Sequence, residues 1–198
     1  IFMGKLFIFD MGEVLILNVK NLQAIAKRFG FDYKPFRAFY GIYDKDLMEG
    51  KMDSMEFLRI VEKEYNVKVD ENLFITDFHP IPNHFIMNVI DELRKNGHRC
   101  VLGSNTFAPH ISVVSNLEDK PLSHLDHLYL SHEMGIAKPD VEFFDYILRE
   151  EGVRPENTVF VDDKIDNINA ATSIGIKTLL YNDNNRKEAE EFFKAYIQ

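Results

Sequence analysis

Polar side chains capable of chemistry stand where the buried apolar runs of this chain stop. Asp10 follows the run KLFIF, Ser104-Asn105 follows RCVLG, and the pair Asp162-Asp163 follows TVFV. Lys138 lies in the loop beyond a further run, HLYL. Parallel sheets bind ligands at the carboxyl ends of their strands, so these residues are expected to converge. Adjacent carboxylates repel each other unless a cation or hydrogen bonds compensate them, and the acidic pair therefore favours a bound cation.

Together these segments carry the groups that move a phosphoryl group. The transfer needs a nucleophile, a divalent cation, hydrogen-bond donors and a cationic side chain. Asp10 can supply the nucleophile and Asp163 a metal ligand, while Ser104, the Asn105 backbone N–H and Lys138 can supply the donors and the charge. Taken singly, each residue has a plainer interpretation as a turn, a helix cap or a solvated loop charge. Only the combination predicts phosphoryl transfer.

The elements that must position these side chains alternate between strands and helices. Short apolar runs bounded by turn residues predict strands over residues 5–9, 99–103, 127–130, 158–161 and 177–180. Amphipathic helices separate several of them; one carries Phe85, Val89 and Leu93 and ends at Gly97. This alternation predicts an α/β fold with a Rossmann-like, doubly wound parallel sheet and helices on both faces.

The segment between Ile16 and about Pro82 interrupts this alternation, because strand signals vanish and helical ones follow one another. Asp53 with Glu56 is a capping-box pattern that opens one of its helices. We therefore expect a helical insertion over residues 17–82 and an α/β core formed by residues 1–16 and 83–198. Four aromatic residues share one helical face and are expected to form the core of this insertion: Phe36, Phe39, Tyr40 and Tyr43.

The order carboxylate, hydroxyl, lysine, acidic pair resembles the four motifs of the haloacid dehalogenase-like hydrolase superfamily. The matching stretches are FDMGEVL from Phe9, LGSNT from Leu102, AKP from Ala137 and FVDDKIDNI from Phe160. The resemblance spans the chain, with residues 17–82 in the place of a helical cap. Within the superfamily the chain is similar to small bacterial sugar-phosphate phosphatases with an Asp-x-Gly first motif, including alpha-D-glucose-1-phosphate phosphatases.

This resemblance implies a Mg²⁺-dependent phosphatase that acts on a small phosphorylated metabolite through an aspartyl-phosphate on Asp10. Asp10, Asp163 and the backbone carbonyl of Gly12 would bind the Mg²⁺, and Asp162 would act on it through water. Mg²⁺ takes one or two protein carboxylates together with phosphate oxygens and waters, which agrees with this set. The residues expected to hold the phosphate are Ser104, Asn105 and Lys138.

Gly12 departs from the usual pattern of these motifs. Most phosphatases of the superfamily carry Asp there, and its side chain protonates the leaving oxygen; such a general acid contributes about 10²–10⁴-fold to the rate. Glu13 is adjacent, but the usual loop geometry points its side chain elsewhere. Two alternatives stay open. Gly12 favours a catalytically weak or silent phosphate-binding or regulatory protein, and a metal-free haloacid dehalogenase could use Asp10 on carbon, although the acidic pair argues against it.

Composition limits the other partners of this 198-residue chain. Its 23 Lys and Arg against 32 Asp and Glu give a net charge of −9, which disfavours nucleic acid or an anionic membrane as the main partner. The single cysteine, Cys100, excludes an intrachain disulfide framework and a Cys-rich zinc site. The sequence has neither an apolar stretch of about 20 residues nor a signal-peptide pattern at its start, so we expect a cytoplasmic protein. The oligomeric state is left open.

Overall fold

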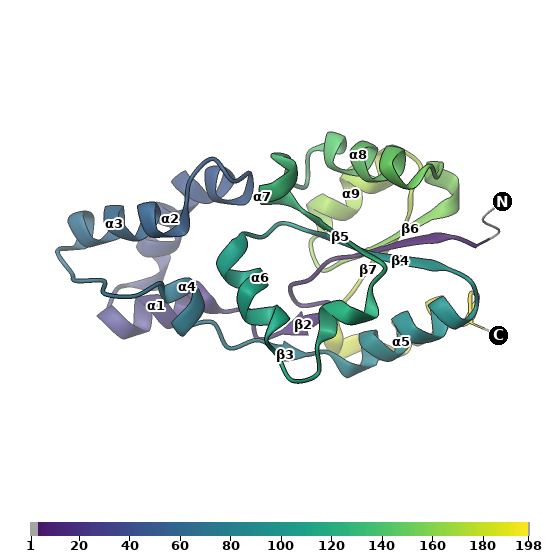
Figure 1. Ribbon diagram of the computed structural model, residues 1–198, viewed down its shortest axis with the longest axis horizontal. Coiled ribbons are helices and arrows are strands. Elements are labelled where there is room, and N and C mark those ends of the chain that lie inside the picture. Colours follow the sequence, from purple (N-terminus) through teal and green to yellow (C-terminus); the bar gives the residue numbers. More distant parts are fainter. Residues whose placement is uncertain (1–3, 198) are drawn as a thin grey trace.

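Five parallel strands form the central sheet of the computed structural model, which describes residues 4–197 (Figure 1). They are β1 (Leu6–Phe9), β4 (Arg99–Ser104), β5 (His127–Leu130), β6 (Thr158–Asp162) and β7 (Lys177–Leu180). Their order across the sheet is β5-β4-β1-β6-β7, and every neighbouring pair is parallel. Each strand begins and ends within one residue of its predicted bounds. The expected parallel sheet is confirmed.

Helices cover both faces of the sheet because alternate side chains of a strand point to opposite sides. Leu6 and Ile8 of β1 pack in a core with α8 (Val141–Glu151) and α9 (Ile165–Ser173). Phe7 and Phe9 pack in a second core with α5 (His84–Lys95) and α10 (Arg186–Lys194). Two further helices flank the sheet, α6 (Ala108–Ser115) and α7 (Ser131–Met134). The doubly wound arrangement is thus confirmed.

The strand order reverses between β1 and β6. From β1 the chain passes to β4 and β5 on one side, and then to β6 and β7 on the other. Open α/β sheets bind ligands beyond the carboxyl ends of the strands at such a switch point. Asp10 directly follows β1, where its N–H donates to the carbonyl of Val161 at 2.9 Å, and Asp162 is the last residue of β6. The topology therefore brings the first and last acidic motifs together.

Four helices occupy the chain between β1 and α5. They are α1 (Asn21–Phe29), α2 (Tyr33–Met48), α3 (Ser54–Tyr65) and α4 (Leu73–Thr76), and Figure 1 shows them gathered beyond one end of the sheet. Asp53 and Glu56 form the predicted capping box at the start of α3. Phe36 and Tyr40 are buried among these helices, and Phe39 and Tyr43 pack against the same apolar cluster. The aromatic face of α2 thus helps to form the core of the insertion.

A short antiparallel ribbon joins this helical segment to the sheet, where no strand was expected. β2 (Ile16–Leu17) pairs with β3 (Ile81–Pro82). Each strand has only two residues, and one residue of β3 is a proline, so neither strand shows the alternation that reveals a strand. Helix α6 was not predicted either, because its sequence APHISVVS lacks a distinct polar face.

The insertion also contacts the core away from the ribbon. The ring of Phe74 in α4 meets that of Phe107, before α6, edge to face with centroids 5.0 Å apart. Lys45 of α2 pairs with Asp140, which precedes α8, at 3.0 Å. These contacts hold the four helices over the end of the sheet that carries Asp10. Among residues 4–197, no helix combines the length and apolarity needed to cross a membrane.

Candidate active site

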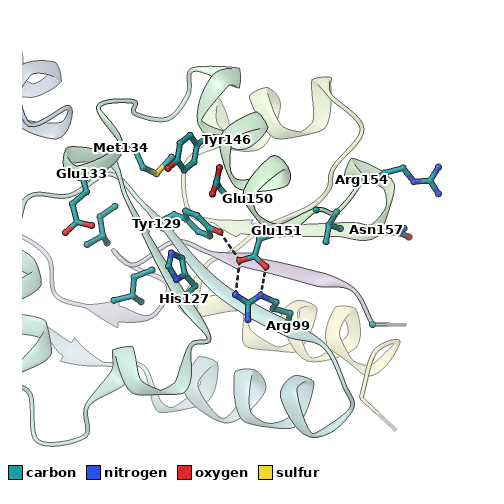
Figure 2. Close-up of a pocket in the computed structure, with 15 residues that line it drawn as sticks. Arg99, His127, Tyr129, Glu133, Met134, Tyr146, Glu150, Glu151, Arg154 and Asn157 are labelled. Carbon is teal, nitrogen blue, oxygen red and sulfur yellow. Dashed lines mark hydrogen bonds and ion pairs between the residues drawn. The ribbon is translucent and has the colours of Figure 1, made fainter. Parts of the chain in front are cut away.

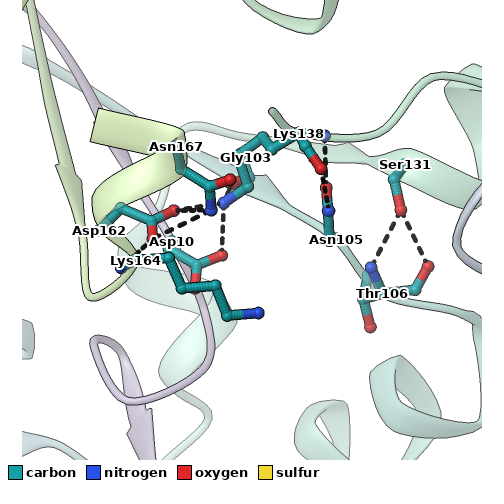
Figure 3. Close-up of polar contacts among 9 residues, drawn as sticks. All are labelled: Asp10, Gly103, Asn105, Thr106, Ser131, Lys138, Asp162, Lys164 and Asn167. Carbon is teal, nitrogen blue, oxygen red and sulfur yellow. Dashed lines mark hydrogen bonds and ion pairs between the residues drawn. The ribbon is translucent and has the colours of Figure 1, made fainter. Parts of the chain in front are cut away.

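One buried ammonium group, from the third motif, contacts each of the other three motifs (Figure 3). Nζ of Lys138 donates to Oδ1 of Asp10, to Oδ2 of Asp162 and to the carbonyl of Gly103, each at 2.7 Å. An ammonium has three protons, so these bonds use all of them. The Lys138 side chain is 1% exposed. Lys138 thus pairs with two carboxylates at once, and a phosphate would have to displace one of its partners to contact Nζ directly.

Asp162 is fully buried, and donors surround both of its oxygens. Oδ1 accepts from the backbone N–H of Lys164 at 2.8 Å, and Nδ2 of Asn167 lies 3.1 Å from Oδ1 and 3.0 Å from Oδ2. Lys138 provides the remaining bond. Asp162 therefore positions the lysine, and Asn167, in the first turn of α9, positions Asp162.

Asp163 differs from its neighbour, because its Oδ1 is buried and has no hydrogen-bond partner among the described residues. Burial, with the charges of Asp10 and Asp162, raises the pKa of Asp163 to about 6. Oxygen atoms of these three carboxylates lie within 4.8 Å of one another. Burial also raises the pKa of Asp10, against the opposing charge of Lys138. An unpartnered carboxylate oxygen among like charges suits a divalent cation, so this donor set fits Mg²⁺.

Ser104 and Asn105 line the same cavity as Asp10, at the end of β4. The side-chain amide of Asn105 has a role that the sequence did not predict. Its Oδ1 accepts from the backbone N–H of Lys138 at 2.8 Å, and its Nδ2 donates to the Lys138 carbonyl at 2.7 Å. Next to it, Oγ of Ser131 bonds both the N–H and the carbonyl of Thr106, at 3.0 and 3.1 Å. These bonds fix the loop after β4 and the backbone that carries the lysine.

Gly12 has an unstrained backbone, because its φ lies outside the left-handed region. A Cβ at this position would meet Cγ2 of Val19 at 3.7 Å and Oδ2 of Asp10 at 4.0 Å, which are ordinary contacts. The fold therefore does not require glycine here. The Glu13 carboxylate accepts a hydrogen bond from the Val19 N–H at 3.3 Å, so it is engaged at the start of the helical insertion.

A cavity of about 320 Å³ connects the motif residues to the insertion, a size that suits small-molecule ligands. Besides Asp10, Gly12 and Asp163, its lining includes side chains that no sequence pattern predicted: Asn21, Arg37, Asp44 and His110. The His110 ring stacks on Phe78 with centroids 4.2 Å apart, and burial lowers its pKa to about 3. No sequence motif marks these residues, which come together only when α1, α2 and α6 pack.

A larger hollow of about 960 Å³ lies along β5 and contains none of the motif residues (Figure 2). Two of its charged side chains, Arg99 and Glu151, pair with each other. Glu151 accepts from Nη2 of Arg99 at 3.0 Å and from the hydroxyl of Tyr129 at 2.9 Å. The smaller cavity, which holds the nucleophile candidate and the cation site, is therefore the candidate active site.

Comparisons with known proteins agree with this site. Residues 5–175 match the model of the haloacid dehalogenase-like hydrolase family. The chain is 30% identical over 189 residues to the D-ribitol-5-phosphate phosphatase of Bacteroides thetaiotaomicron, and the match covers 89% of this chain and 91% of the relative.

Solved structures show the same relationship. A crystal structure of a variant haloacid dehalogenase family enzyme from Bacteroides thetaiotaomicron, in complex with magnesium and inorganic phosphate, matches with a TM-score of 0.75 and 26% identity over 89% of this chain and 93% of that one. The fold is also shared with a predicted haloacid dehalogenase-like family hydrolase from Porphyromonas gingivalis, which matches with a TM-score of 0.77 and 23% identity over 99% of this chain and 100% of that one. The chain therefore belongs to the haloacid dehalogenase-like hydrolase family, which confirms the expected family and the expected class of enzyme, a phosphoric monoester hydrolase.

Proposed function

We propose that this chain is a Mg²⁺-dependent phosphatase that hydrolyses a small sugar phosphate through an aspartyl-phosphate on Asp10. The observation that carries the proposal is the pairing of Asp10 with the buried Lys138, beside an unpartnered oxygen of Asp163, at the floor of a ligand-sized cavity. The relative named for D-ribitol 5-phosphate supports a small phosphorylated substrate.

Mg²⁺ would be held by Asp10, Asp163 and the backbone carbonyl of Gly12, with Asp162 acting through water. When bound, it neutralises the non-bridging oxygens of the phosphoryl group. The related crystal structure that contains magnesium and phosphate supports this choice of ion. Asp163 suits the role because its Oδ1 has no protein donor in the described chain, whereas both oxygens of Asp162 are occupied by donors.

The catalytic and phosphate-binding roles are assigned to four residues of the chain. One Asp10 oxygen bonds Lys138, so we assign the attack on phosphorus to the other, Oδ2. The Asp10–phosphorus bond forms as the bond to the substrate alcohol breaks, and a water later displaces phosphate and restores the carboxylate. The Ser104 hydroxyl and the Asn105 N–H bind phosphoryl oxygens. Lys138 stabilises the ionised form of Asp10, as its distance of 2.7 Å allows.

Residues 17–82 act as a cap that encloses the substrate, and α1, α2 and α4 contribute to the cavity lining. Because Gly12 supplies no acid, the leaving alcohol departs with little proton assistance. The anomeric hydroxyl of a sugar is more acidic than its other hydroxyls and needs less assistance. We therefore propose sugar 1-phosphates as the preferred substrates.

Turnover of p-nitrophenyl phosphate, with and without Mg²⁺ and a chelator, tests the proposal. Hydrolysis that requires Mg²⁺ and stops with chelator supports it. No hydrolysis at any Mg²⁺ concentration would instead indicate a silent phosphate-binding protein. Release of halide from a 2-haloacid in excess chelator would indicate the metal-free dehalogenase.

A further inference from the structure

Helix α2 presents one continuous stripe of side chains to the cavity that contains Asp10. The stripe consists of Tyr33, Arg37, Tyr40, Asp44 and Met48, which are three or four residues apart. Residues at this spacing share one face of a helix. The proposed function assigns no task to this face, although it lines the same cavity as the nucleophile.

An open ion pair lies at the middle of the stripe. Nη2 of Arg37 is 3.9 Å from Oδ2 of Asp44, which is too long for a hydrogen bond. The two side chains are 47% and 38% exposed, so a ligand in the cavity can reach them. The guanidinium carbon lies 5.5 Å from the ring centroid of Tyr40, which is buried below the pair. The buried Tyr40 ring thus supports the pair, and both charged side chains keep hydrogen-bonding capacity for a ligand.

The chemistry of this pair indicates what it binds. A guanidinium beside a carboxylate has no net charge, so the pair does not attract a second anionic group. It offers several donors next to two acceptor oxygens. A hydroxyl group both donates and accepts, and two neighbouring hydroxyls therefore match a donor and an acceptor placed side by side. Phosphorylated molecules without hydroxyl groups cannot make these bonds.

We infer that Arg37 and Asp44, supported by Tyr40, bind adjacent hydroxyl groups of the substrate and select phosphorylated sugars or polyols over phosphate esters that lack hydroxyls. This inference rests on the proposed phosphatase function and adds the residues that determine its specificity. The pair acts on substrate binding, at a place other than the phosphate, so its loss is expected to raise KM more than it lowers kcat.

The test compares kcat and KM for ribitol 5-phosphate, glucose 1-phosphate and p-nitrophenyl phosphate in the presence of Mg²⁺. The variants are Arg37→Met and Asp44→Asn. Their matched controls on the same helix are Lys34→Met and Asp46→Asn, at exposed positions that do not line the cavity. A hydrogen bond to a charged group corresponds to roughly 10- to 100-fold in binding. Of ribitol 5-phosphate and glucose 1-phosphate, we take the one that the wild type hydrolyses with the higher kcat/KM. We expect each variant to raise KM for this substrate by about this factor, with a smaller change for p-nitrophenyl phosphate and no change in the controls.

The outcomes separate this inference from the function on which it rests. Equal losses of kcat/KM on all three substrates would show that the pair only supports the cap, and the inference would be wrong. A wild type that fails to hydrolyse p-nitrophenyl phosphate would overturn the proposed function, and the inference with it. If Arg37→Met unfolds at lower temperature than the wild type, Arg37→Lys replaces it. Lysine keeps the positive charge but lacks the planar guanidinium with its several N–H donors, so the same selective rise in KM is expected.

Discussion

Nζ of Lys138 lies 2.7 Å from Oδ1 of Asp10, and the lysine side chain is almost completely buried. The same ammonium bonds Asp162 at 2.7 Å, so one cation serves two carboxylates that come from neighbouring strands. Without it, neither buried carboxylate would have an ion-pair partner among residues 4–197. Lys138 therefore supports the fold and the ionisation of the nucleophile together.

Lys138→Met is expected to destabilise the protein by about 3–5 kcal/mol, because it leaves buried carboxylates without their partner. Turnover should fall as well. Guanidinium unfolding at pH 7 in the absence of metal measures the effect. Lys63→Met, at an exposed position on α3, is the control and should stay within about 0.5 kcal/mol of wild type. A loss below 1 kcal/mol in Lys138→Met would contradict the shared-cation arrangement.

Asp10→Asn is expected to abolish turnover and leave the fold intact, because the amide is similar in shape but a poor nucleophile. Steady-state kinetics with p-nitrophenyl phosphate and circular dichroism test the two halves of this statement. Asp166→Asn, an exposed carboxylate at the start of α9, is the control. A variant that keeps a tenth or more of the wild-type kcat would exclude Asp10 as nucleophile.

Asp163→Ala is expected to lose Mg²⁺ affinity more severely than Asp162→Ala, because Asp163 has the free oxygen. Asp162→Ala should instead lower stability, since it removes acceptors from Lys138 and Asn167. Calorimetric Mg²⁺ titration and metal-free unfolding separate the two effects. Equal losses of affinity, or an unchanged stability in Asp162→Ala, would show that the roles of these two carboxylates are assigned wrongly.

Because His110 is buried with a lowered pKa, the free energy of unfolding is expected to fall as the pH becomes acidic. Its pKa is about 3 in the fold and about 6.5 when unperturbed, so between these values the unfolded chain binds more protons than the folded one. The contribution of His110 is complete above pH 6.5 and decreases as the pH falls toward 3. Between pH 7 and pH 5 the loss is roughly 2 kcal/mol.

Guanidinium unfolding at pH 7 and pH 5 measures this loss. His110→Phe keeps an aromatic ring against Phe78 and removes the titrating group. Its stability should therefore depend less on pH than that of the wild type. His79→Gln, at an exposed position, should behave like the wild type. If His110→Phe and the wild type lose the same stability, His110 is protonated in the fold and the assignment is wrong.

The sequence predicted the sheet well because its three central strands, β4, β1 and β6, are buried on both faces. Runs such as TVFV and RCVLG then stand out as apolar segments bounded by turns. The ribbon of β2 and β3 was not predicted, because strands of two residues show no periodicity. The motif residues could also be predicted to converge, since each follows a strand whose carboxyl end lies at the same edge of a parallel sheet.

The residues of the helical insertion that line the cavity could not be found in the same way. Arg37 and Asp44 have the appearance of ordinary charges on an amphipathic helix, because nothing local distinguishes a cavity from solvent. Asn105 was assigned to the phosphate through its backbone, whereas its side chain bonds the Lys138 backbone 33 residues away. Contacts of such sequence separation depend on packing between elements, which no short pattern records.

Gly12→Asp is the variant most specific to this chain. The position accepts a side chain, because a Cβ there would make only ordinary contacts with Val19 and Asp10 and the backbone is not left-handed. A carboxyl group at this point lies next to the nucleophile and can protonate the leaving oxygen. The gain should be largest for a poorly acidic alcohol.

Gly12→Asp should therefore raise kcat for sugar 6-phosphates by a larger factor than for sugar 1-phosphates, up to the roughly 10²–10⁴-fold that a general acid supplies. Gly12→Asn, which has the same shape without the acid, is the matched control and should give no such gain. Circular dichroism and Mg²⁺ titration establish that both variants fold and bind metal. The same fractional change for both substrate classes, or a wild type that prefers 6-phosphates, would show that the leaving-group argument is wrong. In that case a residue of the helical insertion must already supply the proton.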